Sequence, residues 1–275
     1  MSKTALVTGA SSGIGEETAR TLHKLGYTVY AAARRTDRLK QLTAIGIHSL
    51  TMDVTDDESM TSGIEQIIAE TGRIDVLVNN AGYGSYGAIE DGSLDEARRQ
   101  FEVNVFGLGR LTQLVLPHMR AQRSGTIINI SSMGGRLTTP LGGWYHATKY
   151  AVEALSDALR METAPFGIDV VVIEPGGIRT EWSGIAADHL EETAEGSAYA
   201  SQIKAVANSM RSESTNKRQS QPSVIADTVE KIVTARKPRT RYVVGFAAKP
   251  LVALRRILPD RAFDRVISAA LGVRR

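Results

Sequence analysis

The chain has 275 residues and a formal net charge of +3, with 42% hydrophobic and 23% charged residues, so it has ample material for a globular core. It contains no cysteine, which excludes disulfides, thiolate nucleophiles and cysteine-ligated metal sites. No apolar run approaches the ~18 residues of a transmembrane helix. No signal peptide is recognised before the first apolar stretch, so we expect a cytoplasmic protein without stable membrane insertion.

The charge is unevenly distributed along the chain. Residues 236–275 contain eleven lysines and arginines against two aspartates, and the rest of the chain is net acidic. Solvated helix faces explain such a basic end, and so would a nucleic-acid partner or attachment to an anionic membrane surface. We expect solvated helix faces and no nucleic-acid partner, and the membrane-surface alternative stays open.

Short apolar runs alternate with helical patterns along most of the chain. Strands are expected at residues 5–7, 29–33, 49–52, 76–78, 126–130, 169–173 and 242–244. Apolar residues recur at helical spacing between them, as in residues 60–68, 151–159 and 224–235. Apolar strands alternating with helices predict an α/β fold with a Rossmann-type, doubly wound parallel sheet and helices on both faces.

A single domain accounts for the chain. Residues 1–245 are assigned to it, with residues 181–223 as a substrate loop or lid and the polar stretch 197–223 as a mobile surface insert. Residues 246–275 are predicted to form an amphipathic C-terminal helical extension, because apolar side chains recur at i, i+3, i+4 and i+7 from Phe263 onwards. We expect this extension to narrow the entrance of a substrate pocket, and a purely structural role is the alternative.

A glycine-rich segment joins the first strand to the first helix. It contains Gly9, Ser11, Ser12, Gly13, Ile14 and Gly15. Gly9 permits a tight turn, Gly13 lets the backbone approach a pyrophosphate, and Gly15 lets the helix pack closely on the strand. A helix N-terminus also favours bound phosphate, so this segment predicts a dinucleotide site.

The end of the second strand indicates which dinucleotide binds. An NAD site has an acidic residue there for the ribose 2′-hydroxyl, whereas an NADP site has a cation for the 2′-phosphate. Ala33 stands at the position of the acid, and Arg34 and Arg35 follow. A guanidinium can hold a phosphate through two parallel hydrogen bonds, so we expect NADP(H). A pair of surface arginines opening the next helix is the alternative.

Tyr145 and Lys149 are four residues apart in a predicted helix and therefore share one face. A free tyrosine, with a pKa of about 10, is a poor acid or base at neutral pH, and a nearby ammonium lowers that pKa. The pair would then exchange a proton with a carbonyl or alcohol oxygen. Ser132, which follows a predicted strand, is expected to bind the same oxygen in preference to Ser131, and His146 is expected to be structural.

These motifs together resemble the short-chain dehydrogenase/reductase family in its single-domain form. The similarity covers residues 4–180. It rests on the glycine-rich segment, Asp53-Val54, Asn79-Asn80-Ala81-Gly82, Asn104, Ser132, Tyr145, Lys149 and Pro175-Gly176-Gly177-Ile178-Arg179-Thr180. The resemblance implies hydride transfer between NADP(H) and a carbonyl or alcohol carbon.

The family also implies a role for each motif. Tyr145 would be the general acid/base, Ser132 would bind the substrate oxygen, and Lys149 would hold the nicotinamide ribose and lower the pKa of Tyr145. The backbone of Asn104 would hold a water that links Lys149 to solvent. The other residues expected to contact the cofactor are Asp53 and Val54 at the adenine, Asn80, Ala81 and Gly82 along the adenosine, and Pro175, Gly176, Ile178 and Thr180 at the carboxamide and phosphate. The pro-S face of the reduced ring would then meet the substrate.

Substrate choice in the family depends on the segment after Thr180. A largely hydrophobic pocket is expected from Tyr83, Tyr86, Leu137, Leu141 and Trp144, with Trp182, Ile185, Leu190 and Tyr199 as an apolar lid. Packing of these last four side chains on the sheet is the alternative. The chain is most similar to the branch that acts on steroids, retinoids and other lipophilic carbonyls. A homodimer or homotetramer is implied, and no metal is expected because the histidines show no ligand spacing. A regulator that binds NADP without catalysis is the alternative function.

Overall fold

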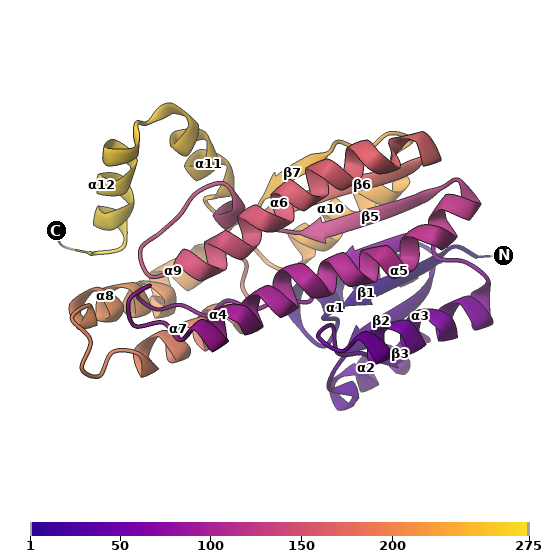
Figure 1. Cartoon of the computed structure of the whole chain (residues 1–275), viewed down its shortest axis with the longest axis horizontal. Coiled ribbons are helices and arrows are strands. Elements are labelled where there is room, and N and C mark those ends of the chain that lie inside the picture. The colour runs from indigo at the N-terminus through magenta and orange to yellow at the C-terminus, as the bar shows by residue number, and fades with distance from the viewer. Residues whose placement is uncertain (1, 274–275) are drawn as a thin grey trace.

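The computed structural model describes residues 2–273, apart from the side chains of Ser214 and Thr215. Within this range seven strands form one sheet in the order β3-β2-β1-β4-β5-β6-β7, and every neighbouring pair is parallel (Figure 1). The strands are β1 (Thr4–Thr8), β2 (Thr28–Ala33), β3 (His48–Thr51), β4 (Val76–Asn79), β5 (Gly125–Ile130), β6 (Ile168–Pro175) and β7 (Arg241–Val244). This confirms the Rossmann-type sheet that the sequence predicts.

The central strands are buried on both faces, as expected in a parallel sheet whose crossover helices cover both sides. All residues of β1 and β4 are buried, so helices must cover both sides. β1 pairs with β2 on one side and with β4 on the other. Successive strands are added outwards from β1 in one direction up to β3, and from β4 onwards in the opposite direction. Ligands of such folds bind at this reversal, beyond the carboxyl ends of the strands.

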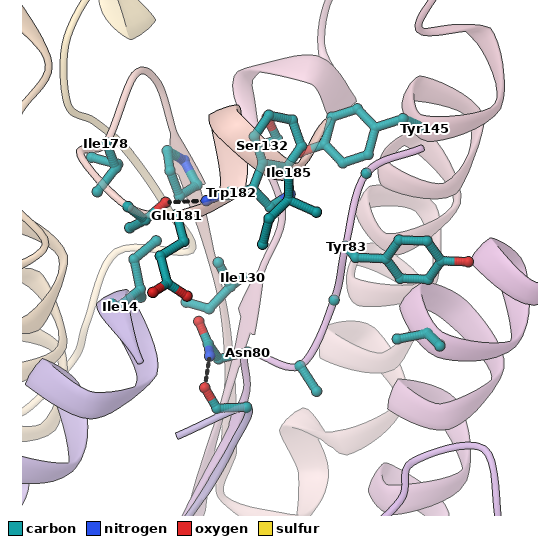
Figure 2. A pocket seen from close by; sticks show the side chains of 18 of the residues that line it. Ile14, Asn80, Tyr83, Ile130, Ser132, Tyr145, Ile178, Glu181, Trp182 and Ile185 are labelled. Atoms are coloured by element: carbon teal, nitrogen blue, oxygen red, sulfur yellow. Dashed lines mark hydrogen bonds between the residues drawn. The ribbon is translucent and has the colours of Figure 1, made fainter. Parts of the chain in front are cut away.

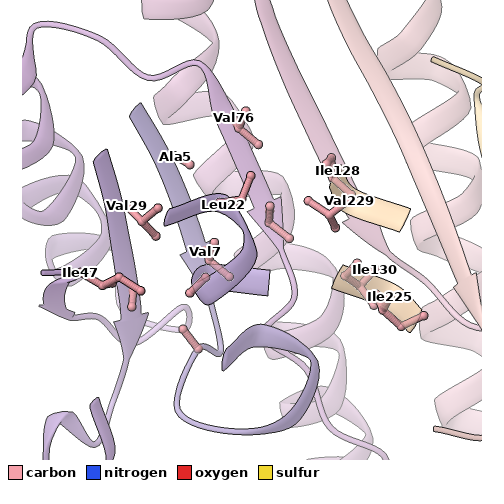
Figure 3. Close-up of a cluster of buried hydrophobic side chains, with 14 of the residues drawn as sticks. Ala5, Val7, Leu22, Val29, Ile47, Val76, Ile128, Ile130, Ile225 and Val229 are labelled. Carbon is pink, nitrogen blue, oxygen red and sulfur yellow. The ribbon is translucent and has the colours of Figure 1, made fainter. Parts of the chain in front are cut away.

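Helices cover the two faces of the sheet in two separate layers. One face carries α1 (Gly13–Lys24), α2 (Lys40–Thr43) and α10 (Ser223–Thr234), and the other carries α3 (Asp57–Thr71), α5 (Gly107–Gln122) and α6 (Gly143–Thr163). Under the first layer, Leu22 and Val229 pack against Val7 and Ile128 of the sheet (Figure 3). Under the second, Ile67 and Met119 pack near Leu77.

Short elements follow the carboxyl ends of the strands. They are η1 (Thr36–Leu39), α4 (Leu94–Phe101), the π-helical turn η2 (Glu102–Phe106), η3 (Met133–Gly135), α7 (Trp182–Glu192), α8 (Ala200–Arg211) and α9 (Glu213–Arg218). The short η4 (Ala164–Phe166) lies at the opposite end, between α6 and the start of β6. The polar stretch 197–223, predicted as a mobile surface insert, contains α8 and α9. Ile203, Val206 and Ala207 recur at helical spacing and are buried against α7, so α8 belongs to the packed structure.

The predicted C-terminal helices are present as α11 (Ala248–Ile257) and α12 (Asp260–Ala270). They lie at the same end of the molecule as α7 and α8 (Figure 1). Phe263 and Ile267 of α12 form a small core with Leu137 and Val252. No helix in the described part of the chain is both long enough and apolar enough to cross a membrane.

Candidate active site

A cavity of about 700 Å³ lies at the carboxyl end of the sheet, where the topology predicts a ligand site. The glycine-rich turn and the arginines after β2 line one part of it. Ser132, Tyr145 and Trp182 line another part (Figure 2). The cavity therefore joins the two groups of residues that the sequence predicts to bind a dinucleotide and to react with a substrate.

The glycine-rich turn has a shape that only glycine permits. Gly9 has a φ of +62°, and a side chain there would come within 2.9 Å of the Ala81 Cα. A side chain at Gly15 would collide with the Gly9 carbonyl. The side-chain amide of Asn80 donates to the backbone carbonyls of Thr8 at 2.9 Å and Gly9 at 3.1 Å, which fixes the turn. The bare backbone and the start of α1 fit the phosphates of a dinucleotide.

Gly13 brings two distant parts of the chain together. It has a φ of +55°, and a side chain there would lie 2.9 Å from the Thr180 methyl carbon. The segment that ends at Thr180 can therefore approach the start of α1, on the side where α7 begins.

Cations gather at the end of β2. Ala33 is buried as the last residue of the strand, and the next residues, Arg34 and Arg35, line the cavity. Arg38, one turn further on, and Arg99 of α4 line it as well. An anionic group in this part of the cavity would lie near guanidinium groups. Ala33, which stands where an NAD site has an acidic residue, has no carboxylate to repel it.

Tyr145 of α6 and Ser132 face each other at the apolar part of the cavity (Figure 2). Ser132 is the N-cap of η3 and accepts a hydrogen bond from the Gly134 amide at 3.0 Å. Burial raises the pKa of Tyr145 to about 12, and a hydrogen bond with Ser132 opposes this increase. The pair places two hydroxyl groups where one substrate oxygen can contact both.

Lys149 lies one helical turn after Tyr145, whose pKa is raised and not lowered as the sequence predicts. Its Nζ is 6.0 Å from the centre of the Tyr145 ring and donates to the Ile130 carbonyl at 3.0 Å. Burial lowers the pKa of Lys149 to about 8, and the Glu153 carboxylate opposes this decrease. Burial thus raises the pKa of Tyr145 and lowers the pKa of Lys149, and both shifts favour the uncharged form of the side chain.

His146 holds the loop that carries Ser132. Its Nε2 accepts from the Thr139 amide at 3.1 Å, so Nδ1 carries the proton and donates to the Gly134 carbonyl at 3.0 Å. Burial lowers the pKa of His146 and favours this neutral form. The structural role expected for His146 agrees with these contacts.

Aromatic and aliphatic side chains surround the hydroxyl pair. The rings of Tyr86 and Trp182 lie 5.6 Å and 5.3 Å from the Tyr145 ring, between centroids, and Leu137 and Ile185 complete this side of the cavity. Burial raises the pKa of Tyr86 well above its usual value. This part of the cavity fits an apolar group next to a polar oxygen.

Known proteins resemble the chain over most of its length. The short chain dehydrogenase family profile matches residues 3–190. The chain is 37% identical to 3-ketodihydrosphingosine reductase of Bacteroides thetaiotaomicron, over 98% of each chain. It is 35% identical to an NADPH-dependent 3-dehydrocapnine reductase of Ornithobacterium rhinotracheale, over 95% of each chain. A crystal structure of a short-chain dehydrogenase from Streptomyces avermitilis superposes with a TM-score of 0.82 at 33% identity, over 100% of this chain and 99% of that one.

The chain belongs to the short-chain dehydrogenase/reductase family. It is thus an oxidoreductase with an NAD(P)-binding fold that acts on small molecules. Its predicted site residues meet in one place, because almost all of them line the same cavity. They are Gly9, Ser11, Ser12, Gly13, Ile14, Arg34, Arg35, Asp53, Val54, Asn80, Ala81, Gly82, Ser132, Tyr145, Lys149, Pro175, Gly176, Ile178 and Thr180.

Asn104 and Gly15 are the two predicted site residues of this short-chain dehydrogenase that do not line the cavity. The Asn104 side chain is buried and bonds to both backbone groups of Tyr83, accepting at 3.0 Å and donating at 2.9 Å, and donates to the Thr148 hydroxyl at 3.1 Å. It lies within the π-helical turn η2, a geometry often found at functional sites. Asn104 therefore braces the segment that faces Lys149.

Four residues predicted to line the substrate pocket do not line the cavity. Leu141 and Leu190, the latter on α7, are buried in the core that α7 forms with α8. Trp144 packs edge-on against Phe101, with the centroids 6.5 Å apart, and the Tyr199 hydroxyl donates to Glu90 at 2.7 Å. Apolar composition alone does not distinguish a pocket side chain from one that packs beside it.

Sequence reasoning missed Arg38 and Glu181, which line the cavity and form an ion pair at 3.1 Å. The sequence could have indicated Arg38 as a further cation of the site, since it lies four residues after Arg34. No sequence pattern indicates Glu181, because its partner is 143 residues away. Within residues 2–273 no group of three His, Asp or Glu side chains is arranged to hold a metal, and the absence of a metal stays a prediction.

Proposed function

We propose that this protein is an NADPH-dependent reductase of lipophilic ketones or aldehydes, which also oxidises the corresponding alcohols. One observation carries the proposal: Ser132 and Tyr145 meet at the apolar part of a cavity whose other part carries Arg34 and Arg35. When bound, the cofactor would supply a hydride to the substrate carbon. A regulator without catalysis would not need this arrangement.

The proton comes from Tyr145. The Ser132 hydroxyl donates a hydrogen bond to the substrate oxygen and holds it beside the Tyr145 hydroxyl. With a pKa of about 12, Tyr145 is protonated at neutral pH and can act as an acid towards the oxygen that develops negative charge. The Lys149 ammonium, protonated below a pKa of about 8, adds positive charge beneath this site and would hold the nicotinamide ribose.

The preference for NADPH rests on the end of β2. Ala33 offers no carboxylate to a ribose 2′-hydroxyl, whereas Arg34 and Arg35 can bind a 2′-phosphate bidentately. The relative described as NADPH-dependent supports the same choice. Asp53 and Val54, Asn80 to Gly82, and Pro175 to Thr180 would contact the adenine, adenosine and nicotinamide portions.

The substrate class rests on the aromatic and aliphatic walls around Tyr145. Tyr86, Leu137, Trp182 and Ile185 would take an apolar group attached to the carbonyl. One relative is described as a reductase of a 3-keto compound, which supports a ketone substrate. A cytoplasmic location stays a prediction.

A homo-oligomer is also part of the proposal. Phe106, Leu155 and Met161 on η2 and α6 are large apolar side chains that are 57%, 45% and 67% exposed. Exposed apolar side chains on neighbouring helices favour association with another surface of the same kind.

Oxidation of NADPH and NADH against a panel of ketones and aldehydes tests the function. We expect turnover with NADPH, favouring lipophilic carbonyls, and transfer of deuterium from the pro-S position of labelled NADPH. The double variant Ala33→Asp/Arg34→Gln should shift the preference towards NADH, because loss of a charge-assisted phosphate contact costs about 1.5–3 kcal/mol, or roughly one to two decades in affinity. Absence of turnover with every carbonyl would favour the regulator, and equal constants for the two cofactors would refute the NADPH preference.

A further inference from the structure

An ion pair spans the cavity between two segments that are distant in the sequence. Arg38 Nη1 donates to Glu181 Oε2 at 3.1 Å, and both side chains line the cavity. Arg38 belongs to η1, one turn after Arg34. Glu181 follows Thr180 and precedes α7, and its side chain points from there into the cavity (Figure 2). The pair thus links the part of the cavity that Arg34 and Arg35 line to the residue that precedes α7.

The fold does not depend on this pair. The side chains of Arg38 and Glu181 are 38% and 63% exposed, and exposed ion pairs contribute little to stability because water and salt screen them. A carboxylate inside a cavity that fits phosphates is also unfavourable for any dinucleotide, since like charges repel. A stronger anion can therefore displace Glu181 from Arg38 at small cost.

We propose that Glu181 competes with the 2′-phosphate of the cofactor for Arg38, so that this ion pair sets how strongly the protein prefers NADPH over NADH. The inference rests on the proposed NADPH preference and adds two residues to it. A phosphate monoester carries more charge than a carboxylate and matches the planar guanidinium equally well. NADPH recovers the Arg38 contact that Glu181 gives up, whereas NADH, which lacks this phosphate, does not.

Binding of NADPH and NADH to the purified protein, measured by calorimetric titration without substrate, tests the competition. Glu181→Gln should increase the affinity for NADPH relative to NADH by about two- to fivefold, the range expected from freeing one exposed ion pair. Arg38→Gln should weaken NADPH by about tenfold and leave NADH almost unchanged. Adenosine 2′,5′-bisphosphate, compared with 5′-AMP, should follow the same pattern, because it carries the 2′-phosphate without the nicotinamide.

The double variant Arg38→Gln/Glu181→Gln makes the test specific. Once Arg38 is absent, removal of the Glu181 charge should change NADPH and NADH binding by the same factor. Glu195→Gln, which removes an exposed carboxylate beyond the end of α7, is the matched control and should change neither. Circular dichroism of each variant checks that the fold is retained.

Two outcomes would overturn the inference while leaving the NADPH preference intact. In the first, Glu181→Gln alters both cofactors equally, so the carboxylate acts only by general repulsion. In the second, the selectivity gain persists without Arg38. Equal affinity of the unmodified protein for NADPH and NADH would instead refute the proposed preference itself, and the inference with it.

Discussion

At Tyr145, burial and hydrogen bonding act on the same proton in opposite directions. Burial raises the pKa of the phenol and the bond with Ser132 lowers it, so the group stays protonated at neutral pH. A protonated phenol suits reduction, in which it donates to the carbonyl oxygen. Oxidation of an alcohol requires the phenolate and should therefore be favoured by alkaline pH.

Replacing Tyr145 tests its role as the proton donor. Tyr145→Phe should lower kcat by ~10²–10⁴, the usual contribution of general acid catalysis, while NADPH binding changes little. Steady-state kinetics and cofactor titration measure the two effects separately. Tyr150→Phe, on an exposed part of the same helix, is the control and should retain activity. Retention of more than about a tenth of the activity in Tyr145→Phe would contradict general acid catalysis of that size.

Lys149 makes the stability of the protein depend on pH. Its pKa falls from 10.5 to about 8 on folding, so between these pH values the unfolded chain keeps a proton that the folded protein has lost. Stability contributed by Lys149 should therefore rise with pH across this window, by about 3 kcal/mol in total.

Urea unfolding of the wild type and of Lys149→Met at pH 7 to 10.5 measures this dependence. The stability of the wild type relative to Lys149→Met should increase above pH 8. A difference between the two proteins that does not change with pH would show that the ammonium is as well solvated in the folded protein as in the unfolded chain.

At the scale of elements, α12 reaches the cavity only through another side chain. Its Phe263 and Ile267 pack with Leu137, and Leu137 lines the cavity. No side chain of α11 or of α12 in the described chain lines the cavity directly. The expectation that these helices narrow the entrance becomes a more specific hypothesis, in which α12 holds Leu137 in place.

Truncation of Phe263 tests this support. Phe263→Ala should destabilise the protein by about 3 kcal/mol, because a buried aromatic ring is lost, and should raise KM for bulky carbonyls more than for small ones. Thermal unfolding and kinetics with both kinds of substrate provide the measurements. Val266→Ala, on the exposed side of α12, should change stability by less than about 0.5 kcal/mol. Unchanged KM values in Phe263→Ala would leave α12 with a purely structural role.

At the scale of the whole molecule, the proposed association surface can be separated from the active site. Leu155→Glu and Met161→Glu place a charge on the exposed side of α6 and should convert an oligomer into monomers, since burying a carboxylate at an apolar interface is costly. Analytical ultracentrifugation reports the change. Ile257→Glu, at the exposed end of α11, should leave the assembly intact. An unmodified protein that sediments as a monomer would refute the proposed oligomer.

The strands, the glycine turn and the chemistry-bearing residues could be predicted from local sequence. Each depends on local rules: apolar runs predict buried parallel strands, and Gly9 predicts a tight turn, where the structure has a positive φ. Tyr145 and Lys149 share a helix face whatever surrounds them. The same locality explains why the amphipathic pattern of α12 was visible in the sequence.

Features that depend on burial and on distant partners could not be predicted before the chain was folded. No local pattern reports burial, which raises the pKa of Tyr145 where the sequence predicts a lowered one. Likewise, Leu190 of α7 packs in a buried core and not in the cavity. The pairing of Arg38 with Glu181 requires the end of β2 to meet the start of α7 across the cavity. Spacing in the sequence records which residues share an element, whereas electrostatic environment depends on which elements the fold brings together.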